Sequence, residues 1–452
     1  MGGAIPGKRK AGLRSLLKLG VAAFGFLAGI GLLVGSYSVR HPAAGISGVD
    51  RRDAPPHGLH FMRGKNVVLV SHELTLTGGP LLLMELAVLL KNAGATVQWM
   101  TINKRDGAGS EVTDNLEQRL QNKGILLVPA KGEETVRAAV DSDLVVLNTA
   151  VAGKWIDSTL KESDQQRVLP KVLWWIHEMR GHYFTLNYVK HMPEVAAVMI
   201  DSHATAEYWK NRTQQRLGIK IPKVHVVHLG NSKDLTEAAE NPLARHLLRQ
   251  HVRESLGISD RDVMFSAINS VSRGKGQDLF LKAFAQALKT LGSSTGIYAV
   301  IVGSDWIGQP KFEAELRELV EKNGMQHVVR FVNKTMNVVP YLAASDVLVQ
   351  NSQARGECFG RISIEAMAFK LPILGTAAGG TTEIVVDGST GFLHQVGKEG
   401  VPDLASNIIN LFRDPKLRAR MGEAGYKRVQ ERFLEQHMSE RIGRVLKEVL
   451  QQ

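Results

Sequence analysis

The feature that most constrains the fold is a series of short apolar runs separated by amphipathic, helix-like stretches, and this series occurs twice. The runs are apolar throughout rather than alternating, so each is expected to be a strand covered on both faces, as in a parallel sheet. Strands that alternate with helices predict α/β domains of the doubly wound type. Two such domains place a ligand cleft at the carboxyl ends of their strands. The runs are 67–71, 96–102, 124–129, 143–149, 172–178, 196–202 and 224–229, then 263–269, 298–303, 328–332, 346–352, 371–376 and 391–396.

The predicted domain boundaries follow from this pattern and from the length of 452 residues, which is too long for a single core. An N-terminal Rossmann-like domain is predicted over residues 65–230 and a C-terminal one over residues 257–428. Residues 231–256 are charged, helical in pattern and without a strand, and are predicted to connect the two domains. Residues 429–452 are predicted to form a helix that crosses back onto the first domain.

The N-terminal segment differs from the rest of the chain because a basic start is followed by a long uncharged, apolar stretch. Residues 19–38 carry no charge and are long enough to span a bilayer core of roughly 30 Å as a helix. Residues 1–18 are basic, so the positive-inside bias predicts a cytosolic tail, a type II signal anchor and a lumenal remainder. Residues 39–64, rich in Pro and Gly, are predicted to be a flexible stem. The alternative is a cleaved signal peptide with a long apolar region.

Charge and cysteine content exclude several classes of function. The net charge is +12, but residues 1–65 hold ten Lys or Arg against two Asp, a local +8 that leaves +4 for residues 66–452. A nucleic-acid-binding protein would carry a basic stripe on its folded part, and none stands out, so no nucleic-acid partner is expected. Cys358 is the only cysteine, which excludes an intrachain disulfide and a Cys-rich metal site.

Two carboxylates give the strongest local signal. Glu357 and Glu365 are separated by seven residues, and Gly360 interrupts the chain between them. Glu357 is therefore expected on a loop after a strand, and Glu365 in an early turn of a helix that begins near Ile362. The free N–H groups of a helix N-terminus suit phosphate, and a carboxylate at its edge suits sugar hydroxyls. The alternative is that both glutamates are solvated charges at a helix end.

Two further positions lie at the predicted carboxyl edge of the first sheet. Gly78 and Gly79 follow a strand and precede Pro80, which suits the first position of a helix, and glycines let a ligand approach the backbone closely. His177 ends the strand WWIHE, where cleft residues belong. The alternatives are an ordinary helix start and a structural histidine. The spacing from His177 to His182 is one residue too long for a helical zinc motif, so no metal site is predicted.

This arrangement resembles the family-four retaining glycosyltransferases of the GT-B fold, in particular plant and bacterial members. Their E-x7-E motif matches as Glu357-CFGRISI-Glu365. A second pattern of the family, G-T-x-x-G-G-x-x-E-x-V-x-D-G-x-x-G-F, matches from Gly375 to Phe392. The resemblance covers roughly residues 65–440 and implies two Rossmann-like domains that face a central cleft.

The resemblance also implies an activity. It points to transfer of a glycosyl group from a nucleotide sugar, with UDP as the commonest donor nucleotide, to a lumenal glycan, lipid or small-molecule acceptor. Configuration at the anomeric carbon would be retained, and neither a divalent metal nor another cofactor would be needed. Together with the anchor, it points to the Golgi or another endomembrane. The alternatives are a non-catalytic GT-B partner subunit of a glycosyltransferase complex and a GT-B epimerase.

Roles in the second domain carry over from the resemblance residue by residue. Glu365 would bind the ribose hydroxyls of the nucleotide. Glu357 would face the transferred sugar near its reacting carbon. Gly379 and Gly380, with backbone N–H groups from Thr381 onward, would hold the diphosphate and the sugar.

The remaining roles concern the leaving group and the acceptor side. Lys275 would neutralise the diphosphate as it leaves, because developing negative charge must be offset. The family arginine five residues before this lysine is Ser270 here, and Arg273 is predicted to substitute for it. His177 would contact the donor sugar or the acceptor, and the Gly78–Gly79 loop would face the donor phosphates and the acceptor. Ser270 is the one departure that favours the non-catalytic alternative.

Overall fold

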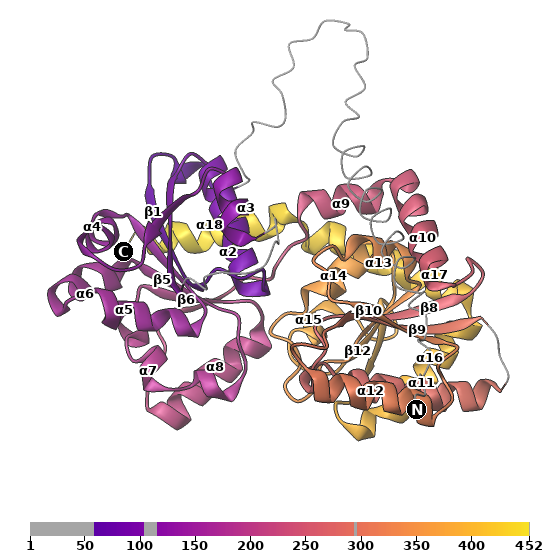
Figure 1. The fold of residues 1–452 in the computed structure, drawn as a ribbon. Helices are drawn as coiled ribbons and strands as arrows, with labels where there is room; N and C mark the ends of the chain where they lie inside the picture. The colour runs from indigo at the N-terminus through magenta and orange to yellow at the C-terminus, as the bar shows by residue number, and fades with distance from the viewer. Residues whose placement is uncertain (1–57, 104–114, 293–295, 452) are drawn as a thin grey trace, which may run out of the picture. The chain divides into compact units, whose positions relative to one another are not determined.

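The computed structural model describes residues 58–103, 115–292 and 296–451, which form two α/β domains (Figure 1). The predicted cytosolic tail, the predicted anchor at residues 19–38 and most of the predicted stem lie outside the described residues. Within the described ranges, no helix combines the length and the apolar character that a membrane crossing requires. The prediction of two parallel sheets is confirmed, because every paired strand in both sheets runs parallel to its neighbours.

The first domain contains a seven-stranded sheet in the order β3-β2-β1-β4-β5-β6-β7. The order reverses between β1 and β4, and that switch point is where a doubly wound sheet opens a crevice for a ligand. The strands are β1 (Asn66–Glu73), β2 (Thr96–Asn103), β3 (Leu126–Pro129), β4 (Leu144–Asn148), β5 (Val172–Ile176), β6 (Ala197–Ile200) and β7 (Val224–Val226).

Helices cover both faces of this sheet, which explains why its strands are apolar throughout. Along β1, Val67 and Leu69 join one buried cluster and Val68 and Val70 join the other, because successive side chains point to opposite faces. The helices of this domain are α2 (Gly78–Asn92), α3 (Leu116–Asn122), α4 (Glu133–Asp141), α5 (Lys154–Thr159), α6 (Glu162–Val168), α7 (Leu186–Val189) and α8 (His203–Leu217).

The second domain repeats the plan with six strands in the order β10-β9-β8-β11-β12-β13, and its switch point lies between β8 and β11. The strands are β8 (Val263–Ile268), β9 (Ile297–Ser304), β10 (Val329–Asn333), β11 (Val347–Gln350), β12 (Ile373–Thr376) and β13 (Gly391–His394). The helices are α11 (Gln277–Leu291), α12 (Pro310–Lys322), α13 (Val339–Ala344), α14 (Arg361–Ala368), α15 (Thr381–Ile384), α16 (Val401–Arg413) and α17 (Pro415–Arg432).

Two segments link the domains. Residues 231–256 form two helices, α9 (Lys233–Glu240) and α10 (Pro242–Leu256), where the sequence indicated one helical stretch. The returning helix is α18 (Glu435–Val449), so residues 429–432 belong to α17 and the crossing begins later than the predicted 429. At the crossing, the backbone N–H of Asn231 donates to the carbonyl of Phe433 at 2.7 Å.

Helix α18 packs on the first domain, although it is separated from that domain in sequence by the whole second domain. Figure 1 shows it in yellow beside the indigo helix α2. Its apolar residues, Ile442 and Leu446 among them, share a buried cluster with Leu83 of α2. A Cβ added at Gly443 would lie 2.5 Å from the carbonyl oxygen of Gly58, so the two segments are in backbone contact.

Candidate active site

Two neighbouring cavities lie at the carboxyl ends of the two sheets and share Gly78 and His177 in their linings. The larger, here called the Glu365 cavity, has a volume of about 680 Å³ and contains Glu365 in its wall. The smaller, here called the Glu357 cavity, has a volume of about 590 Å³ and is lined by Glu357 and Lys275. The structure therefore brings together the predicted glutamates, lysine, histidine and first glycine turn.

The Glu357 carboxylate is held by an ion pair with the ammonium of Lys275 and by the hydroxyl of Ser352, which donates to it. Burial alone would raise the pKa of Glu357. The Lys275 charge and the hydrogen bonds outweigh burial and hold this pKa below its usual value. Glu357 is therefore an anion near neutral pH, and it fixes a cation beside the cavity.

Glycines shape the loop that carries Glu357. Gly356 and Gly360 have φ of +76° and +93°, in the region that favours glycine. A Cβ added at Gly379 would lie 2.3 Å from the Glu357 carbonyl oxygen, and the Gly380 N–H donates to that same oxygen at 2.8 Å. The two loops therefore pack backbone against backbone.

This packing gives Gly379 and Gly380 a structural role, and the prediction that they and Thr381 hold the diphosphate and the sugar stays a prediction. None of the three lines either cavity. Thr381 is fully buried, and the N–H of Gly380 is already used. Gly379 and Gly380 support the Glu357 loop from behind, because only residues without a side chain allow so close a contact.

Glu365 lies in the second turn of α14 and faces its own cavity. Burial, together with the nearby Glu85 carboxylate, raises its pKa, and the Arg361 charge only partly opposes them. Arg361 is the first residue of α14; its Nη1 is 2.8 Å from a Glu85 oxygen and its Nε is 3.3 Å from a Glu365 oxygen. Glu85 comes from α2, so this ion pair joins the two domains at the cavity wall.

His177 follows β5 and is held through both ring nitrogens. Its Nδ1 donates to the Asp201 carboxylate at 2.7 Å, and its Nε2 lies 2.9 Å from the side-chain oxygen of Asn148. Burial would lower the pKa of His177, but Asp201 and then Glu178 more than compensate and raise it. The Asp201 carboxylate and the raised pKa favour the protonated form of this ring, which lies beside both cavities.

Gly78 and Gly79 form the first turn of the fifteen-residue helix α2, as predicted. The preceding Thr77 makes no side-chain hydrogen bond to cap the helix. A Cβ at Gly79 would lie 3.2 Å from Thr149, so the turn also packs closely against the loop after β4. A helix N-terminus with uncapped N–H groups favours an anion in the adjoining cavities.

The structure does not place Arg273 at the site, although the sequence predicts it there. It shares a short turn with Lys275, but its guanidinium lies 2.6 Å from Glu315 and 4.9 Å from the ring centroid of Phe312, both on α12. The Arg273 side chain is 67% exposed and lines neither active-site cavity, whereas Ser270 lines the Glu357 cavity. The difference arises because the turn directs its two basic side chains apart, and Glu315 of α12 pairs with Arg273 while Glu357 pairs with Lys275.

Comparison with known proteins identifies the family. Residues 63–244 match the family model described as glycosyl-transferase family 4, and residues 249–428 match the model described as glycosyl transferases group 1. The chain therefore contains one domain of each of these two glycosyltransferase families. The resemblance found in the sequence is confirmed at that level.

Curated relatives match this glycosyltransferase over part of their length. One is the N-acetyl-alpha-D-glucosaminyl L-malate synthase of Bacillus anthracis, 32% identical over 192 residues, which are 42% of this chain and 46% of that protein. Another is a D-inositol 3-phosphate glycosyltransferase of Kribbella flavida, 29% identical over 218 residues, which are 47% of this chain and 48% of that protein. The chain spans about half the length of the curated relatives it matches.

Solved structures confirm the GT-B fold of the glycosyltransferase. Anabaena HepE in complex with UDP and glucose aligns with a TM-score of 0.70 at 19% identity, over 85% of this chain and 99% of that one. Sucrose-phosphate synthase from Thermosynechococcus elongatus aligns with a TM-score of 0.61 at 21% identity, over 84% and 98%. At these identities the likeness establishes the fold.

One group among the described residues has the side chains to hold a metal ion. His203, His228 and Glu383 offer ligand atoms within 4.8 Å of one another. The carboxylate of Glu383 is already engaged, since it accepts from the backbone N–H of His203 at 3.0 Å and of Ala204 at 2.9 Å, and contacts His228 at 2.7 Å. These bonds join α15 to the start of α8, so a structural link between the domains explains the group.

Four site residues of the glycosyltransferase were not predicted: Glu85, Asn148, Asp201 and Arg361. Signals for three of them exist in the sequence. Asn148 and Asp201 each stand at the end of an apolar run, at the same edge as His177. Glu85 is a single charge inside the apolar helix PLLLMELAVLL. Arg361 has no such signal, because its role depends on Glu85, 276 residues away.

Proposed function

We propose that this glycosyltransferase transfers a sugar from a nucleotide sugar, a UDP-sugar in the first instance, to an acceptor with retention of configuration. The observation that carries the proposal is the pair of adjoining cavities. One presents a carboxylate, Glu365, and the other presents a cation, Lys275, beside a second carboxylate, Glu357. Both cavities are lined by His177 and by Gly78, which lies at the N-terminus of α2. HepE, which has the same fold, has been solved with UDP and with UDP-glucose, and this supports UDP as the first nucleotide to test.

In this proposal the nucleoside occupies the Glu365 cavity. The Glu365 carboxylate accepts hydrogen bonds from the ribose hydroxyls, and Val338 and Val339 provide an apolar wall for the base. The diphosphate lies across Gly78, where the helix N-terminus favours negative charge. The sugar then reaches the Glu357 cavity, with His177 at its edge.

The chemical step needs no covalent intermediate on the protein. The bond between the anomeric carbon and the diphosphate oxygen breaks, a bond to the acceptor oxygen forms on the same face, and the acceptor proton passes to the departing phosphate oxygen. Lys275 and the first N–H groups of α2 offset the charge that develops on the leaving diphosphate. Glu357 is tied to Lys275 and Ser352, so it is assigned to orienting the lysine and the sugar hydroxyls rather than to nucleophilic attack. No metal or other cofactor is required.

Calorimetric titration with UDP, GDP and ADP tests the donor assignment. We expect UDP to bind, and Glu365→Ala to weaken it by about 10- to 100-fold, because a hydrogen bond to a charged group contributes roughly 1.5–3 kcal/mol. Glu318→Ala, on the exposed face of α12, is the matched control and should bind UDP as the unaltered protein does. A folded protein that binds none of the three nucleotides would instead favour the non-catalytic partner, the reading that Ser270 supports.

We also propose that the chain is a type II membrane protein of the Golgi or another endomembrane, anchored by residues 19–38. The lumenal placement predicts N-glycosylation at Asn211 and Asn333, which head Asn-x-Thr triplets and are exposed. Expressed in eukaryotic cells, the chain should run faster on a gel after glycosidase digestion, and the Asn211→Gln/Asn333→Gln variant should not shift. A C-terminal epitope that stays accessible from the cytosol would contradict this topology.

A further inference from the structure

A third cavity lies on the second domain and shares no lining residue with the two active-site cavities. Its volume is about 460 Å³. Its walls come from α10, from the end of α13 and the two residues before β11, from residues 369–372 and from the first turn of α17. We refer to it as the α10–α17 pocket. The active-site proposal leaves this pocket without a role.

The α10–α17 pocket is strongly basic. Its lining contains three arginines, one lysine and one histidine, but a single carboxylate, that of Asp346. The basic residues are Arg245, His246, Arg249, Lys370 and Arg418. Such an excess of cations in a concave site raises the local concentration of anions.

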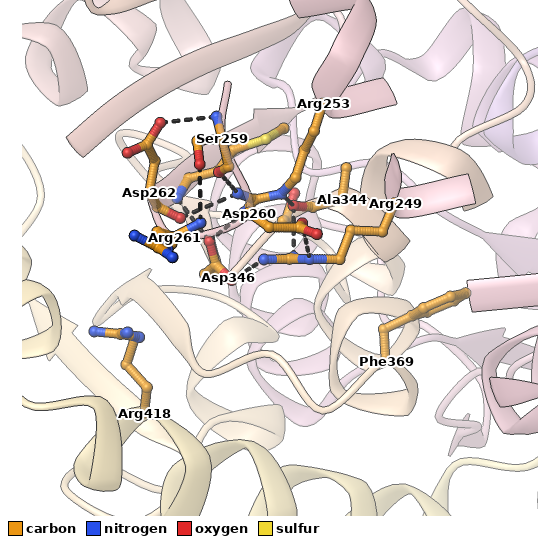
Figure 2. A network of polar contacts seen from close by, with 12 residues as sticks. Arg249, Arg253, Ser259, Asp260, Arg261, Asp262, Ala344, Asp346, Phe369 and Arg418 are labelled. Carbon is orange, nitrogen blue, oxygen red and sulfur yellow. Dashed lines mark hydrogen bonds and ion pairs between the residues drawn. The ribbon is translucent and has the colours of Figure 1, made fainter. Parts of the chain in front are cut away.

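Asp346 does not balance this charge, because it is already fully engaged (Figure 2). One of its oxygens lies 3.1 Å from Nη2 of Arg249. The other accepts from Nη2 of Arg253 at 2.5 Å and from the backbone N–H of Met264 at 2.8 Å. Arg253 is buried beneath the pocket and also binds three backbone carbonyls, so this network anchors α10 to the sheet.

Arg245 and Arg418 are the two arginines of the pocket lining that do not pair with Asp346. Within the described ranges neither forms an ion pair: Arg245 donates to the carbonyl of Phe369 at 3.2 Å, and Arg418 donates to the carbonyls of Leu411 and Phe412. Both are half-buried, and burial lowers the pKa of each. The neighbouring Arg249 lowers the pKa of Arg245 further, and the charges of Asp346 and Asp414 oppose the effect of burial at Arg418 only in part. A half-buried guanidinium without a counter-ion is unfavourable, and a bound anion would relieve it.

The shape and polarity of the pocket indicate the kind of anion. Guanidinium groups carry planar pairs of donors that match phosphate oxygens better than a point charge does. Arg418 lies in the first turn of the eighteen-residue helix α17, whose N-terminus is already capped by Asp414, so the guanidinium groups and not this helix end supply the positive charge. Pro242, Phe369, Leu371 and Pro372 provide apolar wall that an organic substituent could cover.

We propose that the α10–α17 pocket binds a phosphomonoester, with Arg245 and Arg418 as its principal ligands and a small organic group against the apolar wall. The ligand is a phosphate-bearing metabolite or the headgroup of a phosphomonoester lipid, which share this chemistry. The site is separate from the donor site, and its occupation does not depend on the proposed transfer reaction.

The test is titration of the purified chain, kept saturated with UDP so that the donor site is filled. The soluble probe is glycerol 3-phosphate, and the lipid probe is phosphatidylcholine vesicles with and without phosphatidic acid. We expect one of the two probes to bind, and Arg245→Met/Arg418→Met to weaken that binding by at least about tenfold. Binding of glycerol 3-phosphate identifies a soluble ligand, and binding of the phosphatidic acid vesicles alone identifies a lipid headgroup.

The control is Arg261→Met/Arg420→Met, which removes the same charge from two exposed arginines that do not line the pocket. This variant should bind the probe as the unaltered protein does, and all three proteins should show the same circular dichroism and UDP affinity. Binding of neither probe would overturn the proposal. Equal losses in the two double variants would overturn it too, because net charge alone would then explain the effect.

Discussion

Replacing Glu357 with glutamine is expected to lower the rate of sugar transfer by roughly 10²–10³-fold, the range found when one preorganised electrostatic group is removed. Glutamine keeps the size of the side chain but removes the charge that holds the Lys275 ammonium beside the cavity. UDP affinity should stay close to that of the unaltered protein, because Glu357 lies in the cavity assigned to the sugar. The measurement is the initial rate of UDP release from a panel of UDP-sugars, with calorimetric UDP binding beside it.

The matched control for this substitution is Arg273→Ala. Arg273 lies two residues before Lys275 and belongs to the same turn, but its guanidinium contacts Glu315 and points away from both cavities. This variant should transfer sugar at nearly the unaltered rate. A loss as large as that of Glu357→Gln would show that Arg273 swings into the site when the donor binds, and the orientation described above would then not be the active one.

Mild acid is expected to destabilise the second domain through His394, by roughly 3 kcal/mol in total between pH 6.5 and pH 4. Burial lowers the pKa of His394 from 6.5 to about 4, with Asp403 opposing only weakly. His394 is 3% exposed; its Nε2 lies 2.8 Å from Asn351, and its Nδ1 has no partner in the described structure. The His394 imidazole is therefore protonated below about pH 6.5 in the unfolded chain, but only below about pH 4 in the folded chain. The stabilisation is complete above pH 6.5 and is lost as the pH falls through this window.

The measurement is the unfolding free energy in urea, or the melting temperature, at pH steps from 7.5 to 4. In His394→Gln the amide can still donate to Asn351 but does not titrate, so the slope between pH 6.5 and pH 4 should be shallower by up to about 1.4 kcal/mol per pH unit. Other groups that titrate in this range act in both proteins and cancel in the comparison. Identical slopes in the two proteins would show that His394 is not buried as the neutral form.

Much of the fold could be predicted because it depends on local pattern. The strands are apolar on both faces, so runs such as VVLVS and VLWWI indicate buried parallel strands without knowledge of their neighbours. Gly78 and Glu365 were also predictable, because each depends on one turn between a strand and a helix. The positions of Gly78 and Glu365 in the structure are therefore determined by the residues next to them in the sequence.

The unpredicted parts of the site depend on which strands become neighbours. Asn148 and Asp201 reach His177 only because β4 and β6 flank β5 in the sheet. The direction of Arg273 depends on α12 supplying Glu315, and the pairing of Arg361 with Glu85 depends on the second domain meeting the first. Gly379 and Gly380 matched a family pattern, but the physical reason for them is a backbone contact with another loop, which spacing does not reveal.

The path of α18 has a consequence for how the protein is made. The first domain is interrupted in sequence, since its sheet ends with β7 near residue 226 while α18, which covers Leu59, Met62 and Leu83, begins at Glu435. As the chain leaves the ribosome, the second domain has all its strands before the first has its last helix. Until α18 is made, the first domain has an apolar face uncovered, so it is the domain expected to need a chaperone during synthesis.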